Sequence, residues 1–201
     1  ALVVGYEQHL IRDAVDLLDP TLEITWVDNT EYAAKGNTHS MLLGLRAAPE
    51  KAVVFDADLV YGPDILQRFI NTPIGNAILV GTGQLDDIES VKTFVDKDDC
   101  VRMIFKREIT AKELELCRFV GEATGVLKFD STTRTELVGE TKRFLSVPGN
   151  ATLNWEHFFD RFLIDHDVVC HFEPSDQWVE IDTPEDYALA LEKFAPQDEE
   201  A

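Results

Sequence analysis

Short apolar runs and longer amphipathic segments alternate along the first half of the chain. The short runs are bounded by polar or turn-forming residues and predict strands at residues 2–4, 22–27, 52–55 and 77–81. Apolar residues recur at helical spacing in the longer segments, which predicts helices at residues 7–18 and 40–48 and from Pro63 onward. This repeated strand–helix–strand order indicates a parallel sheet covered by helices.

The pattern changes after Val91. The segment VKTFVDKDDCVRMIFK contains two alternating stretches around a polar turn, which predicts a β-hairpin. Beyond it, VGEATGVLKFD predicts a strand, STTRTELVGETKRFL and NWEHFFDRFLID predict helices, and WVEIDTPEDYALALEKF predicts a strand that leads into a last helix. The sequence therefore predicts the α/β class, with a mainly parallel sheet and an antiparallel hairpin in the second half.

Length and composition predict one domain. A chain of 201 residues with 45% apolar residues can form a sizeable core, and we expect one domain over residues 1–195 and an acidic tail over residues 196–201. The 3 cysteines lack metal-binding spacing and no signal peptide is visible, which favours a reduced, cytoplasmic protein. No apolar run has the length of a membrane span.

The formal net charge of −20 narrows the range of partners. Nucleic-acid backbones and anionic membrane surfaces repel such a chain, so we expect neither as a partner. An anionic ligand would need a local positive group, which makes a bound cation more plausible than in a neutral chain. The oligomeric state stays unknown at this stage.

Two aspartates directly follow the most hydrophobic predicted strand, in KAVVFDADLVYGPDIL. In a doubly wound sheet, ligands bind beyond the carboxyl ends of the strands, where Asp56 and Asp58 lie. Carboxylate oxygens at an open sheet edge suit Mg²⁺, which proteins often bind together with substrate phosphates. Aspartates that cap a turn explain the same residues equally well.

A second acidic pair lies at the end of another predicted strand, in WVEIDTPEDYALA. Glu180 and Asp182 alternate along this strand and therefore share one face. Thr183 or Asp182 could cap the next helix, but a cap does not explain a glutamate between Val179 and Ile181. We therefore expect a second acidic site that converges with the first.

Six segments occur in the order found in bacterial nucleotidyltransferases. They are VVGYEQHLI, NTEYAAKGNTHSMLLGL, VVFDADLVYGPDIL, VGEATGVLKFD, NWEHFFDRFL and WVEIDTPEDYALAL. Together they cover nearly the whole chain, which resembles the phosphocholine and 2-aminoethylphosphonate cytidylyltransferases. The resemblance implies a GT-A-like Rossmannoid fold with three layers. It also implies Mg²⁺-dependent nucleotidyl transfer from a nucleoside triphosphate, with release of pyrophosphate.

The resemblance also implies the residues of a metal site. Asp58 matches the family's metal-binding aspartate after the central strand, and Glu180 and Asp182 match the acidic residues that complete the metal site. Lys106 matches a lysine that can face phosphate. The implied catalytic residues are therefore Asp58, Lys106 and Asp182, and the implied metal ligands are Asp58, Glu180 and Asp182.

The nucleotide contacts that the resemblance implies are Asn37 and Ser40, in the loop-to-helix segment. Exposed amides at the start of a helix can bind a base or a phosphate. A helix cap at Thr38 or Ser40 gives the same pattern, so both interpretations stay open. The resemblance favours CTP as the triphosphate.

The acceptor that the resemblance implies is a small phosphorylated or phosphonylated amine, such as phosphocholine or 2-aminoethylphosphonate. Trp155 and Glu156 match the family's acceptor wall, and Tyr61 and Trp178 could reach the same mouth. Glu122 lies in the strand that approaches the acceptor in the family. An aromatic face beside a carboxylate suits a cationic head. Core packing explains the two tryptophans equally well, and a plain strand-edge glutamate is the simpler interpretation of Glu122.

One element of the family pattern has no counterpart in this sequence. The Gly-rich loop that follows the first strand in the family, with its arginine and lysine, does not occur, so we expect the sequence to be incomplete at its N-terminus. We therefore expect no turnover from these 201 residues alone. Two other functions fit the motifs: a GT-A glycosyltransferase, which also uses D-x-D to hold a metal and a nucleotide-sugar, and a non-catalytic nucleotide-binding remnant.

Overall fold

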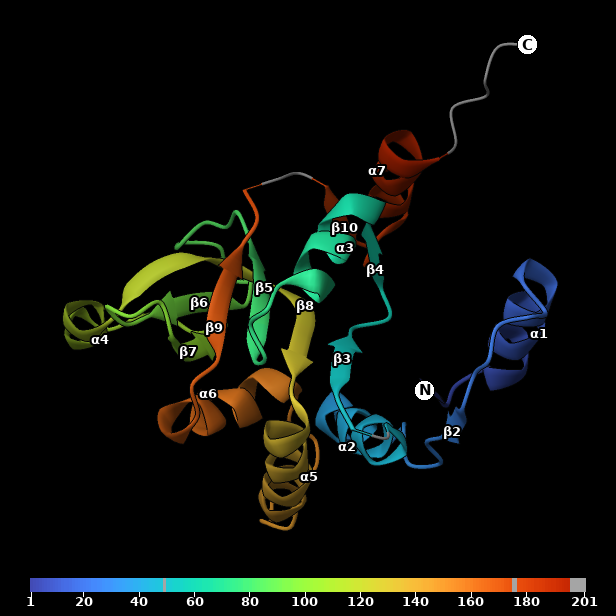
Figure 1. The fold of residues 1–201 in the computed structure, drawn as a ribbon, viewed down its shortest axis with the longest axis horizontal. Helices are drawn as coiled ribbons and strands as arrows, with labels where there is room; N and C mark the ends of the chain where they lie inside the picture. Colours follow the sequence, from blue (N-terminus) through green and yellow to red (C-terminus); the bar gives the residue numbers. More distant parts are fainter. Residues whose placement is uncertain (49, 175–176, 196–201) are drawn as a thin grey trace. The chain divides into compact units, whose positions relative to one another are not determined.

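Two units, each with its own core, contain the described part of the chain. The computed structural model describes residues 1–48, 50–174 and 177–195 (Figure 1). The first unit comprises Ala1–Ala52 and Phe129–Phe162, and the second comprises Val53–Lys128 and Leu163–Ala201. The single domain expected over residues 1–195 stays a prediction, and the acidic tail at residues 196–201 lies outside the described residues.

The first unit begins with the predicted strand–helix–strand motif. Strands β1 (Leu2–Val4) and β2 (Trp26–Asp28) pair in parallel, and α1 (Gln8–Leu18) connects them. The direction of this pair agrees with the sequence pattern. β2 starts later than the predicted strand at residues 22–27, because β1 offers only 3 residues for pairing.

Three helices and a group of aromatic rings form the core of the first unit. Helix α2 (Asn37–Ala47) packs against α5 (Ser131–Leu145), and α6 (Trp155–Asp165) contributes its residues up to Phe162. The buried rings, which contact one another in pairs, are those of Phe129, Phe144, Trp155, Phe158, Phe159 and Phe162. The core of this unit is therefore built mainly from α5 and α6, with Leu42 and Leu45 of α2.

A six-stranded sheet dominates the second unit (Figure 1). Its order is β7 (Val101–Phe105), β6 (Lys92–Val95), β8 (Arg118–Phe129), β5 (Ala77–Gly81) and β9 (Val169–Phe172), and β3 (Ala52–Phe55) also pairs with β8. β6 and β7 form the hairpin that the sequence predicted. β5 and β9 are parallel, whereas β8 is antiparallel to both β5 and β6.

The α/β class is thus confirmed, but the expectation of mainly parallel pairing is wrong for this sheet. The reason lies in β8, a strand of 12 residues that returns to the sheet after the short helix α4 (Ala111–Leu116). A strand that reverses direction needs no crossover helix, so it can enter the sheet between β5 and β6 and pair with both.

Two glycines interrupt the regular pairing of β8. Gly121 and Gly125 have positive φ angles of 148° and 75°, and the pairing register shifts beside each of them. A Cβ on Gly121 would collide with the carbonyl oxygen of Gly81, and a Cβ on Gly125 would lie 2.8 Å from Asp56 Oδ2. Bulges of this kind redirect neighbouring side chains. In β8 they stand on either side of Glu122.

A two-stranded antiparallel ribbon and two helices complete the second unit. Strand β4 (Leu59–Tyr61) pairs with β10 (Trp178–Glu180), and they lead into α3 (Pro63–Asn71) and α7 (Pro184–Phe194) respectively. The core beneath α3 consists of Ile65, Phe69, Ala77, Leu79 and Val126. Among the described residues, no helix is long and apolar enough to cross a membrane.

Candidate functional site

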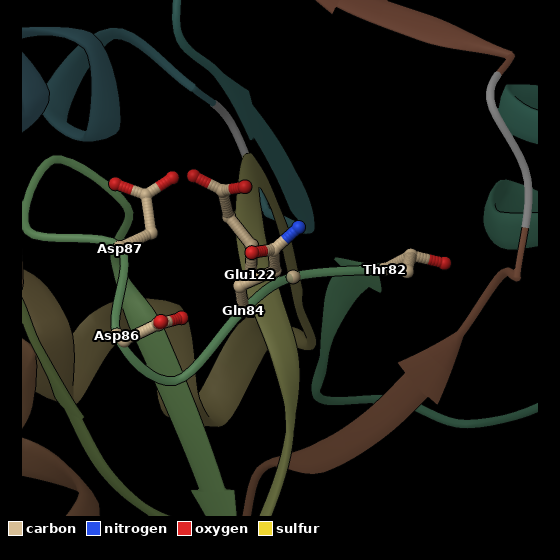
Figure 2. Close-up of a pocket in the computed structure, with 6 residues that line it drawn as sticks. Thr82, Gln84, Asp86, Asp87 and Glu122 are labelled. Atoms are coloured by element: carbon tan, nitrogen blue, oxygen red, sulfur yellow. The ribbon is translucent and has the colours of Figure 1, made fainter.

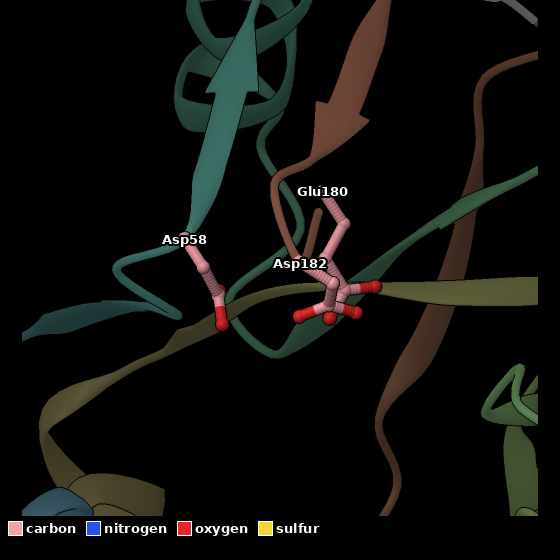
Figure 3. Close-up of side chains that lie close together, drawn as sticks. All are labelled: Asp58, Glu180 and Asp182. Atoms are coloured by element: carbon pink, nitrogen blue, oxygen red, sulfur yellow. The ribbon is translucent and has the colours of Figure 1, made fainter. Parts of the chain in front are cut away.

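Three carboxylates converge at one end of the ribbon formed by β4 and β10 (Figure 3). Asp58 directly precedes β4, Glu180 is the last residue of β10, and Asp182 lies two positions further on. Because the strands are antiparallel, with Glu180 opposite Leu59, these positions are neighbours. One ligand oxygen of each residue lies within 4.8 Å of the others, and all three residues are exposed. We call these residues the carboxylate cluster; their role as metal ligands stays a prediction.

Local hydrogen bonds hold this end of the ribbon together. The Ile181 amide donates to the carbonyl oxygen of Asp58 at 2.7 Å. Thr183 caps α7 through a capping box in which Asp186 Oδ2 accepts from the Thr183 amide at 2.9 Å. The cap therefore uses the carboxylate of Asp186. The Asp182 carboxylate lies with those of Asp58 and Glu180 (Figure 3).

The carboxylate cluster concentrates negative charge. Although Glu180 is exposed as a residue, partial desolvation of its carboxyl, together with the charges of Asp182 and Asp58, raises its pKa above the ordinary value. Carboxylates this close repel one another unless a cation or a proton lies between them. Oxygen ligands with open positions for water or phosphate fit Mg²⁺, so the chemistry of this donor set matches the predicted metal.

Lys106 and Glu122 lie within electrostatic reach of the carboxylate cluster. Burial and neighbouring carboxylates raise the pKa of both Glu180 and Glu122, and the positive charge of the exposed Lys106 offsets part of each rise. Burial, with the charges of Glu180 and Asp87, raises the pKa of Glu122 to about 7. The described structure thus brings the predicted lysine, the predicted strand glutamate and the carboxylate cluster together within the second unit.

An open cavity of about 390 Å³ lies beside Glu122 (Figure 2). Its lining consists of Thr82, Gly83, Gln84, Asp86, Asp87 and Glu122. The carboxylates of Asp87 and Glu122 turn toward each other, whereas the side chain of Thr82 points away from them. Lys92 is buried nearby, and its ammonium donates to the carbonyl oxygens of Asp87 and Lys106. A cavity with this charge favours a cationic ligand group.

The two aromatic residues predicted to reach the acceptor mouth have packing partners in the structure. Tyr61 and Trp178 lie opposite each other in the ribbon. The Tyr61 hydroxyl donates to the carbonyl oxygen of Thr124 at 2.6 Å. The Trp178 indole lies against Gly81, where a Cβ would be 2.5 Å from Nε1. Contact of either residue with a substrate stays a prediction.

The predicted site residues of the first unit also have structural partners. Asn37 Oδ1 accepts from the amide of Trp155, the first residue of α6, at 2.8 Å, and Ser40 Oγ accepts from Asn29 Nδ2 at 2.9 Å. Trp155 and Glu156 are each 6% exposed. Helix α2 begins at Asn37, and its N-cap residue Gly36 makes no side-chain hydrogen bond, so the alternative of a helix cap at Thr38 or Ser40 is wrong. The burial of Trp155 favours the packing alternative, while substrate binding by these residues stays a prediction.

Sequence reasoning missed Lys92, Asp87 and the glycines of β8. Lys92 alternates with the fully buried Phe94, so the period of two could have shown that its side chain turns inward. Gly121 and Gly125 stand inside a predicted strand, where glycine typically marks a bulge or a close backbone approach. No local pattern indicates that Asp87 faces β8.

No protein-family model matches the chain, and no curated protein matches its sequence. Solved structures, however, are similar to its fold. The CTP:phosphocholine cytidylyltransferase from Streptococcus pneumoniae has a TM-score of 0.69 and 19% identity, over 94% of this chain and 75% of that chain. The inositol-1-phosphate CTP transferase from T. maritima has a TM-score of 0.68 and 20% identity, over 92% of this chain and 71% of that chain.

A third similar structure is the nucleoside-diphosphate-sugar pyrophosphorylase from Vibrio cholerae. It has a TM-score of 0.63 and 14% identity, over 94% of this chain and 79% of that chain. Together these likenesses confirm that the chain has the predicted nucleotidyltransferase-like, GT-A-like fold.

Proposed function

We propose that the protein is a Mg²⁺-dependent nucleotidyltransferase. In this proposal it transfers a cytidylyl group from CTP to a small phosphorylated or phosphonylated amine and releases pyrophosphate. The observation that carries the proposal is the convergence of Asp58, Glu180 and Asp182 within 4.8 Å in a fold similar to nucleotidyltransferases. Such a reaction brings two polyanions together, so it needs a site that can bind a cation between them.

The reaction forms one phosphorus–oxygen bond and breaks another. An oxygen of the acceptor phosphate attacks the α-phosphorus of CTP, and pyrophosphate leaves with the electron pair of the broken bond. When bound, Mg²⁺ neutralises charge on the phosphate oxygens. The acceptor phosphate is already ionised at neutral pH, so no general base is required. The residues of the chain therefore act by positioning and by charge.

Lys106 is the chain's own positive group for this reaction. It is exposed, and its charge acts on both Glu180 and Glu122, where it offsets part of the rise in pKa that burial and neighbouring carboxylates cause. In the proposal its ammonium binds a phosphate oxygen between the carboxylate cluster and the cavity beside Glu122, where the acceptor binds. A preorganised charge of this kind stabilises the charge that develops on the leaving pyrophosphate.

The acidic cavity supports an acceptor with a cationic head. Asp86, Asp87 and Glu122 contribute carboxylates to its lining. A bound cation would relieve the repulsion from Asp87 that helps to raise the pKa of Glu122. Phosphocholine and 2-aminoethylphosphonate are zwitterions that place such a head a few bonds from an anionic group.

A phosphorylated polyol or sugar is the second candidate acceptor. Two of the similar solved structures are an inositol-1-phosphate CTP transferase and a nucleoside-diphosphate-sugar pyrophosphorylase. Carboxylates in the cavity could accept hydrogen bonds from hydroxyl groups instead of binding a cation. Glycosyl transfer from a nucleotide-sugar could use the same cluster but would release no pyrophosphate. In each of these proposals the protein acts in the cytoplasm and uses the nucleotides there.

A panel of substrates tests the proposal. The full-length gene product is assayed for pyrophosphate with Mg²⁺, each common nucleoside triphosphate, and phosphocholine, 2-aminoethylphosphonate, inositol 1-phosphate or glucose 1-phosphate. We expect CTP with one of the two amines, and a loss of about 100-fold or more in Asp58→Asn. Preference for a sugar or polyol phosphate would refute the amine but keep the reaction class. Release of no pyrophosphate with any pair would refute nucleotidyl transfer.

A further inference from the structure

Tyr61 and Trp178 attach the ribbon that carries the carboxylate cluster to the six-stranded sheet. They face each other across β4 and β10 in the pairing register. The Tyr61 hydroxyl donates to the carbonyl oxygen of Thr124 on β8 at 2.6 Å, and the Trp178 indole packs against Gly81 on β5. One pair of opposite residues in the ribbon therefore contacts two neighbouring strands of the sheet, β8 and β5.

The segment that Tyr61 ends also carries Asp58. At its start, the Asp56 amide donates to the carbonyl oxygen of Gly125 at 3.0 Å. Thr124 and Gly125 are adjacent residues of the β8 bulge, so one short stretch of β8 binds both ends of this segment. The position of Asp58 relative to β8 consequently depends on both hydrogen bonds.

The Tyr61 hydroxyl is held by its hydrogen bond to the Thr124 carbonyl oxygen. Burial raises the pKa of its phenol, and Asp56, Asp58 and Glu180 raise it further, so the group keeps the proton that it donates. Thr124, which accepts that proton, is 2% exposed. A substrate could reach the hydroxyl only by breaking this bond and leaving a buried carbonyl without its donor, which is unfavourable.

We propose that Tyr61 is a positioning residue that holds the carboxylate cluster in register with Glu122 on β8. It would thereby set the spacing between the nucleotide phosphates and the acceptor. Trp178, seated on Gly81, supports the same register from the other strand of the ribbon. The inference rests on the proposed function, because it places the two substrates at the carboxylate cluster and at Glu122.

The test is Tyr61→Phe, which removes the hydroxyl and keeps the ring. Binding of Mn²⁺ to the full-length gene product is measured by electron paramagnetic resonance, without substrate. Wild-type protein should bind a Mn²⁺ ion that Asp58→Asn no longer binds. Tyr61→Phe should weaken this binding roughly threefold to tenfold, below the loss of about 10–100-fold that is typical of groups bonded directly to a metal ligand. The KM values for Mg²⁺ and acceptor should rise more than kcat falls.

Two further variants separate positioning from general stability. Tyr187→Phe is the matched control, since Tyr187 lies on α7 and is 55% exposed, and its Mn²⁺ affinity should equal that of wild type. Gly81→Ala perturbs the same ribbon from the other strand, because its Cβ would displace the Trp178 indole. It should weaken Mn²⁺ binding as well, and it keeps the test open if Tyr61→Phe does not fold.

The outcomes distinguish this inference from the function on which it rests. If Tyr61→Phe or Gly81→Ala melts at a lower temperature but binds Mn²⁺ as wild type does, the contacts are purely structural and the inference is overturned. If wild-type protein binds no Mn²⁺ that depends on Asp58, the proposed metal site is refuted, and the positioning role with it.

Discussion

Replacing Glu122 by Gln should make the protein more stable at neutral and alkaline pH. Burial, with the charges of Glu180 and Asp87, raises the pKa of this carboxyl from 4.5 to about 7, so its ionised form is unfavourable in the folded protein. Lys106 and Lys92 offset part of the repulsion, and the value of about 7 includes their effect. Glutamine keeps the shape of the side chain and removes its charge.

The magnitude follows from the change in pKa. A rise of about 2.5 corresponds to about 3.4 kcal/mol at full strength. Glu122 is only half-buried, so solvent screens part of this energy, and we expect about 1–2 kcal/mol. Because the folded carboxyl binds its proton more tightly than the unfolded one, the wild-type free energy of unfolding falls as the pH rises from about 4.5 to about 7. Glu122→Gln should lack this fall.

Urea unfolding of wild type, Glu122→Gln and the exposed control Glu115→Gln measures the effect. At about pH 4.5 the three free energies of unfolding should agree, and at about pH 8 that of Glu122→Gln should exceed the others by about 1–2 kcal/mol. A difference that is the same at both pH values, or a less stable Glu122→Gln protein at about pH 8, would refute the electrostatic description of this site.

Two other contrasts test the bulge and the carboxylate cluster. Gly125→Ala should lower the free energy of unfolding by roughly 1–3 kcal/mol, because its φ is 75° and a Cβ would lie 2.8 Å from the Asp56 carboxylate. Gly139→Ala on α5, whose Cβ would meet nothing closer than 3.6 Å, should instead stabilise the protein by roughly 0.5–1 kcal/mol. If urea unfolding shows that both variants lose the same free energy of unfolding, this reasoning is wrong. Asp182→Asn should abolish Mg²⁺-dependent activity at nearly unchanged melting temperature. Asp186→Ala should lower the melting temperature and keep the activity, because it removes the cap of α7, worth about 1 kcal/mol, but none of the three carboxylates of the cluster.

Local signals explain which elements could be predicted from the sequence. Helix α5 was predicted with the bounds found, since Asp130 precedes its periodic run and caps it by accepting from the Thr133 amide at 2.8 Å. Strand β5 was likewise predicted with its bounds, because it is short and apolar and ends at a glycine. The direction of β8 could not be predicted, since alternation along a strand carries no information about the direction of its partners.

The candidate site was predictable to the extent that it depends on strand ends. The acidic motifs at Asp58 and at Glu180 and Asp182 each follow or end a strand, and the structure brings them together. The bond from Tyr61 to Thr124 spans 63 positions in the sequence, and no local pattern encodes such a contact. That Tyr61 could reach the acceptor mouth stays a prediction, and its described partner is the backbone of β8.

Phosphorus NMR can follow the proposed cytidylyl transfer directly. The full-length gene product is incubated with CTP, Mg²⁺ and either phosphocholine or 2-aminoethylphosphonate. The CTP resonances should give way to those of pyrophosphate and of a product in which the acceptor phosphorus is joined through oxygen to the α-phosphate. An otherwise identical sample of Asp58→Asn should keep its CTP. Formation of orthophosphate without a joined product would refute cytidylyl transfer, and the same product at the wild-type rate in Asp58→Asn would refute the role of the carboxylate cluster.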